Sequence, residues 1–222
     1  MIRKITIIAL LAIVSNTAFA QHKIKYGINA GATYSKFYGN SSVKSFNRGL
    51  DFMAGVSADY YVSEHFSIKA NLSYERITST DQQQVEVREN FDDPPVLYDV
   101  KFKINYNYLT LPVVAKYEFP KMPSLFVESG IFIGYLLKSG ASNDLPVAGL
   151  GGSDDNTGMN KKFNTGITLG IGKTIPLNAK NDLVIELRDN IGLINTSDVE
   201  VIDNGTIKTN SINLIVGWSF GL

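Results

Sequence analysis

Apolar and polar residues alternate with a period of two along eight segments of the chain. In residues 211–220, "SINLIVGWSF", one set of alternate positions is entirely apolar, while the other set is mostly small or polar. Successive side chains of a β-strand leave on opposite faces, so this pattern predicts a strand with two unlike faces. The same pattern recurs in residues 24–35, 50–60, 66–75, 108–119, 127–138, 163–172 and 183–193. An apolar run at Phe102, Ile104 and Tyr106 is out of phase with Leu109, which predicts a β-bulge near Asn107.

Short and long connections alternate between these segments. The links at 62–65, 120–123 and 176–181 are short and rich in turn-forming residues, whereas 38–48, 78–98, 139–161 and 195–206 are long and polar. An even number of antiparallel strands, with short turns at one end and long loops at the other, is typical of a bacterial outer-membrane barrel. The sequence therefore predicts an all-β fold, an eight-stranded antiparallel up-and-down transmembrane β-barrel.

Alternation alone also fits a soluble barrel with its apolar face inside, as in lipocalins. Three features favour a membrane barrel with its apolar face toward lipid. Glycines are frequent on the polar face, where they leave room for large side chains in a narrow lumen. Charges of both signs lie on that face, which does not suit an apolar ligand cavity. Aromatic residues lie near both ends of the apolar face, as expected for girdles at the two membrane interfaces.

The predicted girdles contain thirteen aromatic residues. Those near the short turns are Tyr26, Tyr60, Phe66, Tyr117, Phe119, Trp218 and Phe220, and those near the long loops are Tyr34, Phe52, Tyr74, Tyr106, Tyr135 and Phe163.

The amino terminus has the three-part pattern of a secretory signal peptide. Arg3 and Lys4 precede an apolar run at 5–14, and "AFA" at 18–20 provides a cleavage site before Gln21. A buried amino-terminal helix is the alternative. We expect residues 1–20 to be the signal peptide and 21–222 to be the barrel domain, exported to the bacterial outer membrane. Without its two leader cations the chain carries 19 basic and 21 acidic residues, which does not point to nucleic acid, and it has no cysteine.

Charged residues of both signs fall on the predicted lumen face, a few residues inside the short turns. Three are acidic and three are basic, which suits mutual neutralisation in a plugged lumen better than a conduction path. A proton or ion relay is the alternative reading. The residues of this lumen charge cluster are Asp59, Lys69, Lys116, Glu128, Glu186 and Arg188.

Few residues suggest catalysis or metal binding. The two histidines, His22 and His65, lie far from any predicted outer-leaflet position, where a lipid hydrolase needs a His and a Ser together. The loop "GGSDDNTGMN" contains Asp154 and Asp155 but lacks the spaced ligand set of a calcium loop, which favours a solvated acidic loop. "NFDDPPVLY" at 90–98 reads either as a sticky surface motif or as a turn made by two prolines. We predict no cofactor, no metal and no enzyme activity.

Five motifs make the chain resemble the small outer-membrane β-barrel proteins of Bacteroidota, often labelled PorT-like. They are "YGINAGATYS" from Tyr26, "YLTLPVVAKYEF" from Tyr108, "FVESGIFIGYLL" from Phe126, "ELRDNIGLINTS" from Glu186 and the closing "INLIVGWSF". Ile131 and Asp189 depart from the family pattern, where we expect a proline and an aromatic residue. The resemblance implies the barrel fold and allows a link to protein secretion.

These observations together predict a non-enzymatic outer-membrane protein with a plugged lumen and four long extracellular loops. Its expected role is structural or interaction-based, as an accessory to secretion or as an adhesin. The rival functions are a narrow channel for ions or small solutes and a lipid-modifying enzyme. The expected partners are outer-membrane lipid, the barrel-insertion machinery and a protein that binds the extracellular loops.

Overall fold

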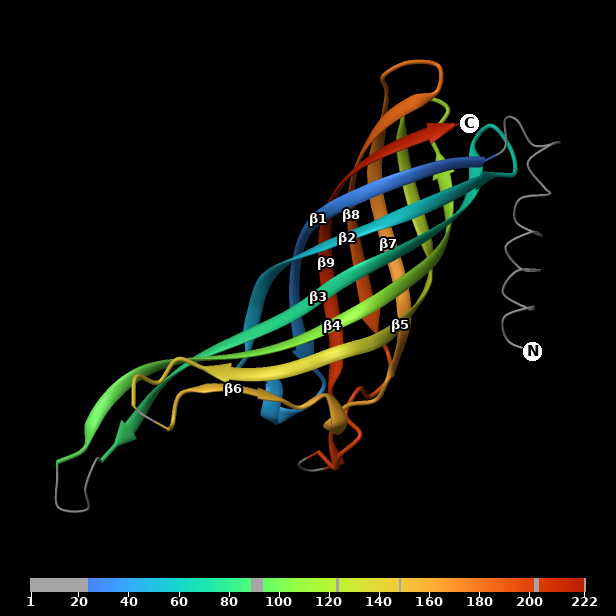
Figure 1. Ribbon diagram of the computed structural model, residues 1–222. Helices are drawn as coiled ribbons and strands as arrows, with labels where there is room; N and C mark the ends of the chain where they lie inside the picture. Colours follow the sequence, from blue (N-terminus) through green and yellow to red (C-terminus); the bar gives the residue numbers. More distant parts are fainter. Residues whose placement is uncertain (1–23, 89–93, 123, 148, 202–203, 222) are drawn as a thin grey trace, which may run out of the picture.

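The computed structural model describes residues 24–88, 94–122, 124–147, 149–201 and 204–221. The proposed signal peptide, His22 and the tip of the 78–98 connection lie outside these residues. In the described part of the chain, eight strands form a ring in which every strand pairs antiparallel with both neighbours, and the pairing of the first strand with the last closes it (Figure 1). The ring strands are β1 (Ile24–Tyr38), β2 (Asn47–Tyr61), β3 (Phe66–Val87), β4 (Val96–Glu118), β5 (Leu125–Asn143), β7 (Phe163–Pro176), β8 (Asn181–Gly192) and β9 (Lys208–Gly221).

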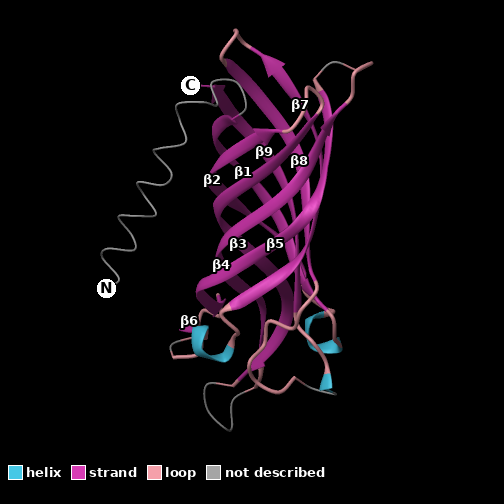
Figure 2. Cartoon of the chain, turned by 90° about the vertical axis from the view of Figure 1, so that its right-hand side faces the viewer, coloured by secondary structure: helices cyan, strands magenta, loops and turns pink. Residues whose placement is uncertain are grey.

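The predicted eight-stranded antiparallel barrel is thus confirmed, and its short and long connections lie at opposite ends. We call these the turn end and the loop end. A further strand, β6 (Gly152–Asp155), pairs only with β5, and two short 3-10 helices, η2 (Ser41–Val43) and η3 (Thr157–Met159), belong to long connections. Figure 2 shows both short helices at the loop end. Within the described ranges, no helix is long and apolar enough to cross a membrane.

The two faces of each strand follow the sequence pattern. On β9, Leu214 keeps 54% of its surface exposed, while Asn213 beside it is 1% exposed. The side chains inside the ring are mostly polar and buried, and large apolar side chains cover the outside. The fold therefore has its apolar surface outward, the reverse of a soluble barrel.

The predicted bulge lies at the expected level but on the neighbouring strand. β4 pairs with β3 without interruption from Thr110 to Val96, whereas Asn107 and Tyr108 pair with Lys138 and Leu136 of β5, which leaves Leu137 as the extra residue. Because β4 keeps its phase, Tyr106 points inward with Tyr108 and is only 4% exposed. The assignment of Tyr106 to the outer aromatic girdle is therefore wrong.

The 78–98 connection is mostly strand rather than loop. β3 and β4 remain paired out to Val87 and Val96, well past the end of β2 at Asn47. In Figure 1 this pair of strands extends sideways from the barrel at the loop end. The polar "DQQQ" at 81–84 reads as a loop in the sequence. In the structure it is a paired strand, and three of its four side chains are exposed, which accounts for the polar composition.

Candidate functional site

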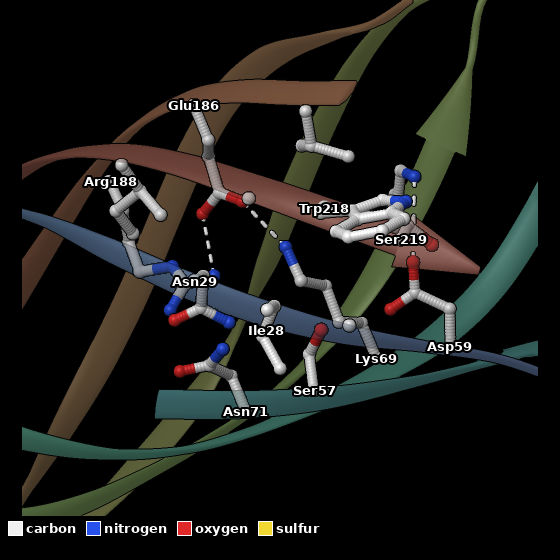
Figure 3. A pocket seen from close by; sticks show the side chains of 15 residues that line it. Ile28, Asn29, Ser57, Asp59, Lys69, Asn71, Glu186, Arg188, Trp218 and Ser219 are labelled. Carbon is white, nitrogen blue, oxygen red and sulfur yellow. Dashed lines mark hydrogen bonds and ion pairs between the residues drawn. The ribbon is translucent and has the colours of Figure 1, made fainter. Parts of the chain in front are cut away.

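Four of the six predicted lumen charges form one ionic network across the barrel. Lys69 of β3 contacts Glu186 of β8 (Nζ–Oε2, 2.5 Å) and Glu128 of β5 (Nζ–Oε2, 3.2 Å). Arg188, also on β8, contacts the same two carboxylates, Glu128 through Nε (3.0 Å) and Glu186 through Nη2 (2.6 Å). Figure 3 shows Lys69 reaching across the lumen to Glu186, with Arg188 beside it. Each charge in the network is nearly fully buried and has partners of opposite sign, as a buried charge requires.

A glycine makes the contact between Arg188 and Glu128 possible. Gly170 of β7 pairs with Glu128 on one side and with Arg188 on the other, so the two side chains meet over it. A Cβ atom at position 170 would lie 2.7 Å from Glu128 Cγ, closer than side-chain atoms pack. The glycine-rich polar face therefore makes room for the long charged side chains.

The other two predicted charges form a second cluster toward the turn end. Lys116 of β4 lies 2.9 Å from Glu118 Oε1 and 3.7 Å from Asp59 Oδ2. Its Nζ atom is also 4.4 Å from the centre of the Phe126 ring, and Lys69 Nζ, from the ionic network, is 5.7 Å from the centre of the same ring. A cation over an aromatic face is stabilised by the ring quadrupole, so Phe126 joins the two clusters.

Side chains leave little free space at this level of the lumen. The cavity bounded by Lys69, Glu186, Asn29 and Asn71 offers about 20 Å³ to the centre of a water molecule. A volume of roughly 10–15 Å³ on this measure holds one water. The side-chain oxygens of Asn29 and Asn71 are buried and have no hydrogen-bond partner within the described residues, so a single water fits here.

Glu75 of β3 is the centre of a polar layer in the lumen and is not one of the six residues of the predicted lumen charge cluster. Its Oε1 atom accepts hydrogen bonds from Ser211 Oγ (2.6 Å) and Asn213 Nδ2 (2.8 Å), with a longer one from Asn190 Nδ2 (3.4 Å). The carboxylate is 2% exposed. Neutral donors, rather than cations, therefore satisfy this buried group, which sequence alternation alone could not indicate.

An apolar cluster fills the lumen at the loop end, and the sequence analysis missed it. Its rings contact one another, with centres 4.6 Å apart for Phe37 and Tyr106 and 6.1 Å apart for Tyr106 and Tyr108. The Tyr106 hydroxyl donates a hydrogen bond of 2.5 Å to Asn160 Oδ1. The loop-end cluster consists of Phe37, Val43, Ile77, Tyr106, Tyr108 and Leu136. Because η2 contributes Val43, the cluster also ties one long connection to the barrel interior.

The remaining predicted girdle residues lie on or near the outer surface. The exposed ones are Tyr60, Phe66, Tyr117, Trp218, Tyr34, Phe52, Tyr135 and Phe163. The half-buried ones contact aromatic neighbours, in the pairs Tyr26–Phe220, Phe52–Tyr74 and Tyr117–Phe119. Aromatic side chains therefore surround the barrel near both of its ends, the places where membrane interfaces are expected.

The described residues considered for catalysis or metal binding, His65 and the pair Asp154 and Asp155, lie at opposite ends of the barrel. His65 is exposed in the turn between β2 and β3, at the turn end. The Thr157 hydroxyl and amide hydrogen-bond to Asp155 and hold the pKa of that carboxyl below its ordinary value, and Lys138 lies 3.7 Å away. No group of His, Cys, Asp and Glu side chains suited to a metal occurs among the residues covered by the structure.

A closed antiparallel barrel with an apolar outside, aromatic residues near both ends and a polar interior defines a transmembrane β-barrel. The chain belongs to the family of outer membrane protein beta-barrel domains, whose model matches residues 19–198. It is accordingly a protein of the bacterial outer membrane. In barrels of this membrane the short turns face the periplasm and the longer loops face the outside of the cell.

Comparison with solved structures returns other outer-membrane barrels. Neisserial surface protein A is 17% identical, with 89% of this chain and 97% of that chain covered and a TM-score of 0.46. Ail, the attachment invasion locus protein of Yersinia pestis, is 12% identical (90% and 100% covered, TM-score 0.43). The outer membrane protease OmpT of Escherichia coli is 8% identical (93% and 99% covered, TM-score 0.43). Comparison with curated proteins found no match. Similarities this low say nothing about what this chain binds or catalyses.

Proposed function

We propose that this protein is a non-enzymatic, non-conducting barrel that anchors its loop-end surface outside the cell. The observation that carries the proposal is the ionic network of Lys69, Glu128, Glu186 and Arg188, which crosses the lumen from β3 to β8. An eight-stranded barrel is just wide enough for side chains to fill its interior. Such a barrel holds its loops in place without transporting a solute.

Two further layers support a closed lumen. The loop-end cluster contributes apolar side chains from four strands and from η2, and Glu75 with its neutral donors lies in the polar interior of the same barrel. An ion crossing the barrel would have to displace apolar rings and separate paired charges. A structural plug accounts for these contacts as static packing, whereas an ion relay would require the charged side chains to change partners.

Single-channel recording on the refolded protein in planar bilayers tests the proposal. We expect no sustained conductance from the wild-type barrel, alongside a wide porin as the positive control. Stable, ion-selective openings of the wild type would overturn the proposal and favour the narrow channel.

The absence of enzyme activity is part of the same proposal. The one histidine in the described residues, His65, lies at the turn end, far from the outer leaflet where a lipid A-modifying enzyme would act. Lipid A from cells with and without the gene should therefore be identical. A mass difference that depends on the gene would identify a lipid-modifying enzyme instead.

The likeness of "YLTLPVVAKYEF" and the other motifs to PorT-like barrels of Bacteroidota supports an accessory role in protein secretion. We propose this accessory role for the protein. We also propose that residues 1–20 are removed as a signal peptide and that the cellular barrel-insertion machinery inserts the barrel. Amino-terminal sequencing of the protein from outer membranes should begin at Gln21. Cells that lack the gene should export less protein through the secretion apparatus that this protein is proposed to assist. Unchanged export would exclude the secretion role.

A further inference from the structure

Beyond the barrel, β3 and β4 continue as a two-stranded ribbon made by residues 81–87 and 96–102. β3 pairs with β2 only as far as Thr80, opposite Asn47. Its pairing with β4 then runs on without a register shift to Val87, opposite Val96. Within the described ranges, no strand pairs with the other edge of residues 81–87. The ribbon therefore has an edge outside the cell that is free to pair.

Two hydrogen bonds show which backbone groups point toward the ribbon's edges. Gln82 and Lys101 lie directly opposite each other, but their N–H groups donate to Asp81 Oδ1 (3.0 Å) and Asp144 Oδ1 (2.6 Å). In an antiparallel ladder such pairs alternate with pairs that exchange hydrogen bonds. The N–H groups of Gln84 and Glu86 therefore point toward the free edge of β3.

The two edges of the ribbon are protected to different degrees. On the β4 side, Pro94 and Pro95 precede the strand, Lys101 lies on it, and Asp144 occupies the outward N–H of Lys101. Prolines and lysines are common devices that block pairing at a strand edge. Residues 81–87, "DQQQVEV", contain neither and have no bulge. The outward N–H of Gln82 is occupied by its neighbour Asp81, but those of Gln84 and Glu86 have no side-chain acceptor within the described residues, so the β3 edge is the less protected of the two.

We propose that the free edge of β3 pairs antiparallel with the same edge of a second copy of this protein, with Gln84 opposite its counterpart. This register uses the outward N–H groups of Gln84 and Glu86, and in it the N–H of Gln82 exchanges Asp81 Oδ1 for a backbone carbonyl of the second copy. It places Gln82 opposite Glu86, Gln83 opposite Val85 and Asp81 opposite Val87, so no like charges face each other. The interface is self-complementary, as a two-fold symmetric dimer requires.

Formation of the dimer would also stabilise the ribbon itself. An isolated two-stranded hairpin is only marginally stable in water, whereas three or more strands stabilise one another. Pairing two ribbons makes a four-stranded sheet. Figure 1 shows that the ribbon reaches sideways beyond the barrel wall.

A second copy of the chain would be a partner for the loop-end surface of the proposed function, but formation of the dimer does not depend on a closed lumen. A monomeric protein would leave the conductance test unaffected, and a conducting barrel would leave the dimer test unaffected. The two proposals therefore fail separately.

Cysteine crosslinking in isolated outer membranes tests the dimer, because the chain has no cysteine of its own. Hydrogen-bonded residue pairs have Cα atoms about 5.5 Å apart, within the range of about 4.4–6.8 Å that a disulfide spans. Gln84→Cys should give a dimer on oxidation. Asp99→Cys is the matched control, because Asp99 lies directly opposite Gln84 on β4 and is also exposed, but belongs to the better protected edge.

Proline substitution provides an independent second measurement. Gln84→Pro and Asp99→Pro each remove an N–H that points out of the ribbon and leave the bonds between β3 and β4 intact. Light scattering of the purified protein in detergent micelles should give a dimer mass for the wild type and Asp99→Pro, and a monomer mass for Gln84→Pro. Equal crosslinking of both cysteines, a monomeric wild type or a crosslink from position 84 to a different protein would overturn the proposal.

Discussion

Lys69 and Glu186 lie 2.5 Å apart (Nζ–Oε2) although their strands are on opposite walls of the barrel. Along the ring, β2, β1 and β9 separate β3 from β8 on one side, and β4, β5 and β7 separate them on the other. Backbone hydrogen bonds connect only neighbouring strands of the ring. The contact between Lys69 and Glu186 therefore links two strands, β3 and β8, that share no backbone hydrogen bonds. Lys69 also shares both of its carboxylate partners with Arg188, and we expect the four residues to behave as one energetic unit.

Removing Arg188 should destabilise the barrel. Arg188→Leu leaves Glu128 and Glu186 buried with Lys69 as their shared cation. Breaking a buried ion pair typically costs about 3–5 kcal/mol, and we expect a loss of this size in the free energy of unfolding by urea in lipid vesicles. The double variant Arg188→Leu, Glu128→Gln removes one stranded charge and should recover part of the loss. Wild-type stability of Arg188→Leu would show that the network does not hold the fold.

A methyl group at Gly170 should also weaken the network. The Cβ atom of Gly170→Ala would lie 2.7 Å from Glu128 Cγ and 3.0 Å from Glu128 Oε1. Overpacking of this kind costs about 1–3 kcal/mol, measurable in the same unfolding experiment. Gly158→Ala is the control, because nothing lies within 4 Å of a Cβ at that position. Equal stability of the two variants would mean that Glu128 moves aside freely.

Charged substitutions on the outer face of β9 should follow depth in the membrane. Leu214 and Val216 are both exposed on the outer surface, and Val216 is closer to the aromatic residue Trp218. An arginine costs about 0–1 kcal/mol near the interface and about 2–4 kcal/mol at the bilayer midplane. Leu214→Arg should therefore reduce the folded, heat-modifiable form on gels more than Val216→Arg does. Equal tolerance of both would show that this surface does not face lipid.

The inward position of Tyr106 predicts a difference between two tyrosines. Tyr106→Phe removes the donor to Asn160 Oδ1 and leaves a buried acceptor short of a partner, which costs about 1–3 kcal/mol. Tyr135→Phe changes an exposed outward ring and should be close to neutral. The comparison uses unfolding in vesicles, and a neutral Tyr106→Phe variant would argue against the loop-end cluster as a packed plug.

The alternation of residue types was enough to predict the ring of strands and the lumen face of Lys69, Glu128, Glu186 and Arg188. It could not locate the extra residue at Leu137, because both Leu136 and Leu137 are apolar and the bulge is set by pairing between strands. Tyr106 was misplaced because alternation assigns apolar positions to the lipid face, whereas here Tyr106 and Tyr108 pack inside the barrel. The partners of Glu75 depend on how far the strands are staggered around the ring, which a one-dimensional pattern does not contain.

The ribbon was missed for a related physical reason. Gln82, Gln83 and Gln84 are all exposed, so this part of β3 has no buried face to impose alternation on the sequence. Its strand character comes from pairing with β4 alone, and polar composition then reads as a loop.

The contact between Lys69 and Glu186 also sets an order of events during assembly. The two residues are 117 positions apart in the sequence, and they reach each other only when the sheet has curled so far that β1 meets β9. Until that seam closes, their charged groups stay hydrated and independent. Dehydration of these charged groups and formation of the network therefore belong to the last step of barrel closure. The ionic network then stabilises the ring only after it has closed.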